Sequence, residues 1–126
     1  MQVQGIHHVA IIVSDYQRSK DFYVNQLGFR VLAENYRQDR KDYKLDLELN
    51  GCCLEIFSGE GHPERPSFPE ACGLRHLAFR VKNIQEVIAD LHARGIETEP
   101  VRTDTYTGEK MTFFRDPDGL PLELHE

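Results

Sequence analysis

The sequence predicts an α+β chain built from two copies of a βαβββ module. Three observations lead there: the halves repeat each other at an offset of 68 residues, an Asn-Gly dipeptide joins two strand-like runs, and a Pro- and Gly-rich segment separates the halves. A length of 126 residues fits one domain. We therefore expect a single domain, 1–126, with a first module at 5–57, a linker at 58–73 and a second module at 74–126.

The elements of the first module follow in order along the chain. The run "IHHVAIIVSD" is rich in Ile, Val and Ala and predicts a buried strand. Ser14–Asp15 can cap the helical stretch "YQRSKDFYVNQL", and Gly28 can close it. Three strands are then expected, "FRVLAENY", "YKLDLEL" and "CCLEIF". Asn50–Gly51 stands between the last two and is a strong hairpin signal.

The second module repeats this order. The run "LRHLAFRV" predicts a strand, and Asn83 is a helix cap. The helical stretch "IQEVIADLHAR" ends before Gly95 and places four apolar residues on one face: Ile84, Val87, Ile88 and Leu91. The runs "IETEPV", "EKMTFFR" and "LPLELHE" are expected to be the remaining strands, with the turn "DPDG" before the last.

Composition narrows the classes of partner. A net charge of −6 argues against a nucleic-acid or anionic-membrane surface, because both require clustered Lys and Arg. No run approaches the roughly 20 apolar residues of a membrane span. The start does not resemble a signal peptide, so we expect a cytoplasmic protein. The three cysteines are expected to be reduced thiols.

Two histidines and two glutamates occupy equivalent positions in the halves. Glu55 follows His8 by 47 residues, and Glu123 follows His76 by the same spacing. The small residue Ala10 shares the strand face of His8 and leaves room for a cavity. A buried carboxylate is costly unless it is paired or binds a metal. We predict that four residues bind one divalent ion of the Zn²⁺, Ni²⁺, Co²⁺, Mn²⁺ or Fe²⁺ type: His8, Glu55, His76 and Glu123.

Three stretches resemble the vicinal oxygen chelate superfamily, in particular its bacterial glyoxalase I-like metalloproteins: "HHVAIIVSDYQRSKDFYVNQLGF", "GLRHLAFRV" and "FFRDPDGLPLELHE". The resemblance covers nearly the whole chain and places the family's metal ligands on the same four residues. It implies the glyoxalase/bleomycin-resistance/dioxygenase fold, in which paired modules form a half-open, barrel-like mixed sheet around Ni²⁺ or Zn²⁺. It also implies a homodimer, because in glyoxalase I the site often forms between two chains.

The activity that the resemblance implies is a divalent-metal-dependent lyase or isomerase. Such an enzyme transfers a proton through a metal-bound enediolate on a small oxo compound or its thiol hemithioacetal. Glu123 is our first candidate for the catalytic base, and Glu55 is the second. Three residues are expected to line the substrate pocket: Phe113, Met111 and Arg80.

The sequence departs from glyoxalase I at three positions that hold glutathione there. Ile12, Gly59 and Cys72 stand in place of polar anchors, and an apolar side chain cannot bind a carboxylate. This argues against glutathione as the thiol carrier. The alternatives are a metal-dependent epimerase or dioxygenase of the same superfamily, and a non-catalytic small-molecule binding protein. The full set of four ligands, Glu55 included, favours the lyase.

Overall fold

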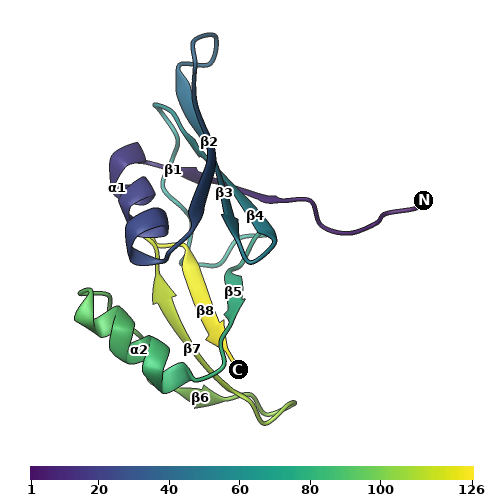
Figure 1. The fold of residues 1–126 in the computed structure, drawn as a ribbon, viewed down its shortest axis with the longest axis vertical. Coiled ribbons are helices and arrows are strands. Elements are labelled where there is room, and N and C mark those ends of the chain that lie inside the picture. The colour runs from purple at the N-terminus through teal and green to yellow at the C-terminus, as the bar shows by residue number, and fades with distance from the viewer. The chain divides into compact units, whose positions relative to one another are not determined.

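The computed structural model describes the whole chain, Met1–Glu126, which divides into two compact units, Met1–Glu64 and Arg65–Glu126 (Figure 1). The division falls inside 58–73, the expected linker. Each unit contains a four-stranded mixed sheet and one helical stretch, in the order βαβββ. The predicted α+β class and the duplicated module are therefore confirmed. None of the helices is long and apolar enough to cross a membrane.

The first unit contains a sheet of strand order β1-β4-β3-β2, in which β1 is parallel to β4 and the other pairs are antiparallel. Asn50 and Gly51 both have positive φ, 48° and 85°, as a two-residue hairpin requires, so this predicted hairpin is confirmed. The elements are β1 (Val9–Val13), α1 (Tyr16–Lys20), η1 (Asp21–Gln26), β2 (Arg30–Arg37), β3 (Asp42–Leu49) and β4 (Cys52–Ser58).

The helical stretch of the first unit differs from the single α-helix that the sequence predicts. Asp15 caps it as expected, since its carboxylate accepts a hydrogen bond from the backbone N–H of Arg18. After one α-helical turn the chain becomes π-helical in η1, and the N–H of Leu27 donates to the carbonyl of Phe22 at 2.9 Å. Phe22 and Tyr23 are consecutive in η1, and both are buried. Apolar spacing alone does not distinguish this wider turn from an α-helix.

One face of the first sheet is buried together with the helical stretch. The ring of Tyr16 in α1 stacks on Tyr43 of β3, with centroids 4.1 Å apart. Its hydroxyl donates a hydrogen bond to Glu34 of β2. Burial is the main cause of the raised pKa of this hydroxyl, and the hydrogen bond to Glu34 is the second cause. The strand residues on this face are buried: Ile11, Val13, Leu45, Leu47, Leu54 and Ile56. The opposite face is more open, and it carries Ala10 and Ile12.

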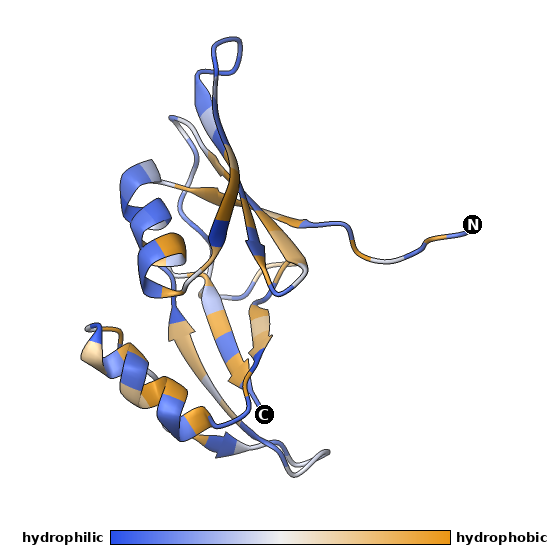
Figure 2. Ribbon diagram, viewed as in Figure 1, coloured by the Kyte–Doolittle hydropathy of each residue, from blue (hydrophilic) through white to orange (hydrophobic).

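The second unit has the strand order β5-β8-β7-β6, again with one parallel pair, β5 and β8. Asn83 caps the helix as predicted, and the apolar stripe along it is visible in Figure 2. The backbone N–H of Ile84 donates to the carboxylate of Glu126 at 2.9 Å, which ties the helix start to the chain end. The elements are β5 (Leu77–Arg80), α2 (Ile84–Ala93), β6 (Arg102–Thr103), β7 (Lys110–Arg115) and β8 (Pro121–His125).

Strand boundaries differ from the prediction in two places. β1 begins at Val9 and β5 at Leu77, so His8 and His76 immediately precede strands and lie outside them. The expected strand at 96–101 is wrong, because the second strand of this unit is the short β6, Arg102–Thr103. Within 96–101 only one residue, Glu99, pairs with β7, and the following Pro100 has no N–H with which to continue a ladder.

Candidate metal centre

The second unit brings His76 and Glu123 into direct contact. Glu123 in β8 lies opposite Ala78 of β5, and His76 precedes Ala78 by two residues, which places it on the same side. The Nε2 atom of His76 lies 2.9 Å from Oε2 of Glu123. The carboxylate side chain is 8% exposed and the imidazole 25%. The register of the parallel pair β5 and β8 therefore positions both donors.

The first unit repeats this arrangement with one addition. Glu55 lies opposite Ala10 in the parallel pair β1 and β4, and its Oε2 contacts Nε2 of His8. The other carboxylate oxygen lies 2.7 Å from Nζ of Lys44, which also binds Asp46 at 2.6 Å. The hydrogen bond to Asp46 and, to a smaller extent, the hydrogen bond to Glu55 raise the pKa of the Lys44 ammonium. Glu55 is thus shared between an imidazole and a fixed cation.

The two pairs differ in the residue that faces the glutamate from the neighbouring antiparallel strand. Asp46 of β3 lies opposite Glu55, whereas Phe113 of β7 lies opposite Glu123. The Phe113 ring also packs edge-on against the imidazole of His76, with centroids 5.2 Å apart. Glu55 therefore has charged neighbours, and Glu123 has an aromatic wall. No Lys or Arg forms an ion pair with Glu123.

The donor atoms have the chemistry and the spacing of metal ligands. Imidazole nitrogen and carboxylate oxygen bind divalent ions such as Zn²⁺ at roughly 2.0–2.2 Å, so two donors to one ion lie about 3.0–3.4 Å apart, depending on the angle between them. The separation of 2.9 Å between His76 and Glu123 is a hydrogen-bond distance that is close to this range. Within neither unit does a third His, Cys, Asp or Glu join the pair. Each unit thus offers two donors suited to one divalent ion.

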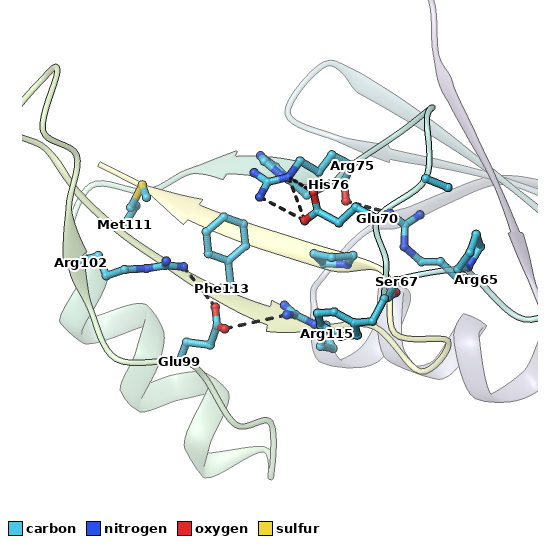
Figure 3. A pocket seen from close by; sticks show the side chains of 14 residues that line it. Arg65, Ser67, Glu70, Arg75, His76, Glu99, Arg102, Met111, Phe113 and Arg115 are labelled. Carbon is cyan, nitrogen blue, oxygen red and sulfur yellow. Dashed lines mark hydrogen bonds and ion pairs between the residues drawn. The ribbon is translucent and has the colours of Figure 1, made fainter.

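A cavity of about 310 Å³ lies within the second unit, and His76 is on its wall (Figure 3). Met111 and Phe113, expected from the sequence to face the substrate, also line it. Arg80, expected with them, is not among the lining residues. The remaining wall includes four arginines: Arg65, Arg75, Arg102 and Arg115.

Sequence reasoning missed two features of these surroundings. Lys44 has a signal in the sequence, since it alternates with Leu45 in β3 and so shares a face with Asp46 and Glu55. Three of the four arginines of the cavity have no periodic signal, because Arg65 comes from a loop and Arg102 and Arg115 come from different strands. Only the folded chain brings these side chains together.

Comparison with known proteins identifies the superfamily to which this chain belongs. The model of the Glyoxalase/Bleomycin resistance protein/Dioxygenase superfamily matches residues 5–124, and this chain belongs to that superfamily. It is 58% identical to the uncharacterized protein YwkD of Bacillus subtilis, over 100% of this chain and 99% of the relative. Identity to the uncharacterized protein YaeR of Escherichia coli is 53%, over 98% and 97%. A solved glyoxalase family protein from Enterococcus faecalis is 63% identical, with a TM-score of 0.94 over 98% of each chain.

More distant relatives include enzymes. The lactoylglutathione lyase of Escherichia coli O157:H7 is 29% identical over 94% of this chain and 90% of its own. The metallothiol transferase FosB of Staphylococcus saprophyticus is 28% identical over 98% and 77%. FosX of Listeria monocytogenes, solved with Mn(II), shares the fold with a TM-score of 0.77, 21% identity and coverage of 98% and 93%. The superfamily therefore contains metal-dependent members that act on small molecules.

Proposed function

We propose that this chain is a divalent-metal-dependent lyase or isomerase of the glyoxalase I type. It would transfer a proton between neighbouring carbons of a small oxo compound or of its thiol hemithioacetal. The observation that carries the proposal is the pair of equivalent His–Glu contacts, one in each unit of the duplicated fold. The relation to a lactoylglutathione lyase and to a metallothiol transferase supports the same reading.

In this proposal, both His–Glu pairs bind the same divalent ion. Two imidazoles and two carboxylates suit Ni²⁺ or Zn²⁺ best, and Co²⁺, Mn²⁺ and Fe²⁺ accept the same donors. When bound, the ion would stabilise the negative charge that develops on two neighbouring oxygens of the substrate. A homodimer in the cytoplasm is part of the proposal, as the resemblance to glyoxalase I implies. The ligands are His8, Glu55, His76 and Glu123.

Glu123 is the better candidate for the group that carries the proton. Lys44 holds the Glu55 carboxylate in an ion pair at 2.7 Å, which fixes its position. Glu123 has no Lys or Arg partner, and its neighbours include His76 and the Phe113 ring opposite it. A carboxylate that must take up and return a proton has to move, and no Lys or Arg holds Glu123 in place. Glu55 is the second candidate.

The thiol in this proposal is a carrier other than glutathione. Ile12 and Gly59, in the first unit, offer no side-chain donor to a carboxylate where glyoxalase I has polar anchors. Cys72, in the second unit, is an exposed free thiol and carries no guanidinium. Each lost charged hydrogen bond would cost about 1.5–3 kcal/mol of binding energy.

The proposal is tested with purified protein in two stages. Metal content is measured first, and we expect about one divalent ion for each set of four ligands. Turnover of methylglyoxal is then followed with glutathione, cysteine and other small thiols, by the appearance of the 2-hydroxyacyl thioester. Metal-depleted protein is the control, and oxygen uptake identifies a dioxygenase. Protein that binds no metal and turns over no adduct overturns the proposal and favours a binding protein.

A further inference from the structure

The cavity of the second unit has a positively charged wall in a chain whose net charge is −6. Four arginines and two glutamates line it, an excess of two positive charges. Figure 3 shows Arg102 and Arg115 on either side of Glu99, with the Phe113 ring nearby. Concentrated positive charge in a hollow attracts anions more strongly than the same charge spread over a surface.

The ion pairs within this wall leave donors available. Glu99 is shared by Arg102 at 3.4 Å and Arg115 at 3.9 Å, and the second distance is too long for a hydrogen bond. Arg75 pairs with Glu70 at 3.2 Å, where both side chains are mostly exposed. Exposed pairs of this kind contribute little, so a bound anion can replace the carboxylates as the acceptor.

Arg65 adds a charge that no carboxylate neutralises. One of its terminal nitrogens donates to the backbone carbonyls of Leu74 and Arg75, at 2.8 and 2.9 Å. Its Nε is buried and has no hydrogen-bond partner. The backbone bonds hold the guanidinium at the wall of the cavity, and its positive charge is uncompensated there.

Apolar side chains form another part of the wall, which adjoins the candidate metal centre at His76. Phe113 and Met111 line it, and the Arg102 guanidinium lies over the Phe113 ring at 5.2 Å from its centroid. A volume of about 310 Å³ is at the lower end for small-molecule sites. An occupant therefore needs a short carbon skeleton for the ring and a compact anionic group for the arginines.

We propose that this cavity binds a small organic dianion beside His76, the phosphate ester of an oxo compound with a short apolar skeleton. This rests on the proposed function, because it defines the substrate class of the same centre. The excess of two charges matches a dianion better than a single carboxylate. The paired N–H donors of an arginine guanidinium also match the spacing of two phosphate oxygens. The residues that would select the substrate are Arg65, Arg102 and Arg115.

The test is calorimetric titration of metal-free protein, so that its result is independent of turnover. Phenyl phosphate at pH 8 is the probe, with benzoate and inorganic phosphate as comparisons. Phenyl phosphate should bind more tightly than both. Arg102→Gln and Arg115→Gln should each weaken it about 10-fold or more. Glu99→Gln should tighten it several-fold, because it removes the competing acceptor.

Arg94→Gln is the matched control, since it removes the same charge from the same unit outside the cavity, where Arg94 pairs with Asp90 in α2. It should leave the affinity unchanged. Equal affinity for benzoate, a loss of affinity in Glu99→Gln, or an equal effect of Arg94→Gln overturns the proposal. Circular dichroism confirms that each variant is folded. Binding without turnover would refute only the proposed lyase, and turnover without phosphate binding would refute only this site.

Discussion

Nε2 of His76 lies 2.9 Å from Oε2 of Glu123, although the two residues are far apart in the sequence. The parallel pairing of β5 and β8 sets this approach, because Ala78 and Glu123 are register partners. A small residue at Ala78 leaves space on this face for the two larger side chains. The first unit repeats the arrangement with Ala10, His8 and Glu55.

Replacing Glu123 by Gln tests the proposed proton carrier. We expect turnover to fall by about 10²–10⁴-fold, because a neutral amide cannot accept the proton. Metal content should fall less, since the amide oxygen remains a donor. Glu55→Gln is the matched variant and should lose less turnover. Steady-state kinetics and metal analysis measure both, and unchanged turnover in Glu123→Gln would assign the base to another residue.

Removal of the metal should lower the stability of the protein. A ligand that binds only the folded state stabilises it by about 2.7 kcal/mol at 100 times its dissociation constant. Treatment with a chelator should therefore lower the melting temperature, and Ni²⁺ or Zn²⁺ should restore it. His8→Ala and His76→Ala should each reduce this gain. A full metal-dependent gain in His8→Ala would exclude that residue as a ligand.

The ion pair between Arg37 and Asp42 predicts a dependence of stability on pH. Arg37 donates through Nε at 2.7 Å and through a terminal nitrogen at 2.6 Å, and these bonds hold the pKa of Asp42 below its ordinary value of 3.8. The folded state therefore binds the proton less readily than the unfolded state. The pair stabilises the fold above about pH 4, and this contribution disappears as the pH falls through the lowered pKa.

Asp42→Asn tests this expectation in urea denaturation at pH 7 and at pH 3. The variant should be less stable than the wild type at pH 7, and the difference should shrink at pH 3. Arg37→Gln should behave alike, and the double variant should lose little more than either single one. If the difference in stability between Asp42→Asn and the wild type is the same at pH 7 and pH 3, the predicted role of the Arg37–Asp42 ion pair is wrong.

Leu122 tests the core of the second unit. It is fully buried on the face of β8 that lies opposite to Glu123. Leu122→Ala should lower the free energy of unfolding by about 2–5 kcal/mol, because it leaves a cavity. Leu54→Ala tests the equivalent position of the first unit. Val3→Ala, at an exposed position near the chain start, should change stability by less than about 0.5 kcal/mol.

Local signals in the sequence predicted most of the elements. Asn83 caps a helix because its side chain can accept an N–H bond, and Asn50–Gly51 turns because both residues tolerate positive φ. The repeat then predicted the duplicated module, since equal spacings imply equal positions. Caps and turns can be predicted in this way because they depend only on residues that are neighbours in the sequence.

Features that depend on the path of a loop were not predictable. Arg65 reaches the cavity only through the turns between β4 and β5, and no periodicity encodes that path. The expected strand at 96–101 failed for a related reason, since its apolar spacing resembles a strand while Pro100 interrupts the ladder. The positions of long side chains and irregular segments depend on tertiary structure, which local sequence patterns do not describe.

The exchange of Asp46 for Phe113 opposite the two glutamates shows what duplication makes available to selection. The same half-site occurs twice, and each copy has its own microenvironment although the strand register is the same. A mutation in the hairpin of β7 and β8 would alter the reactivity of one carboxylate and leave its twin anchored to Lys44. Variation around Phe113 would therefore change one half-site and leave the surroundings of the other unchanged.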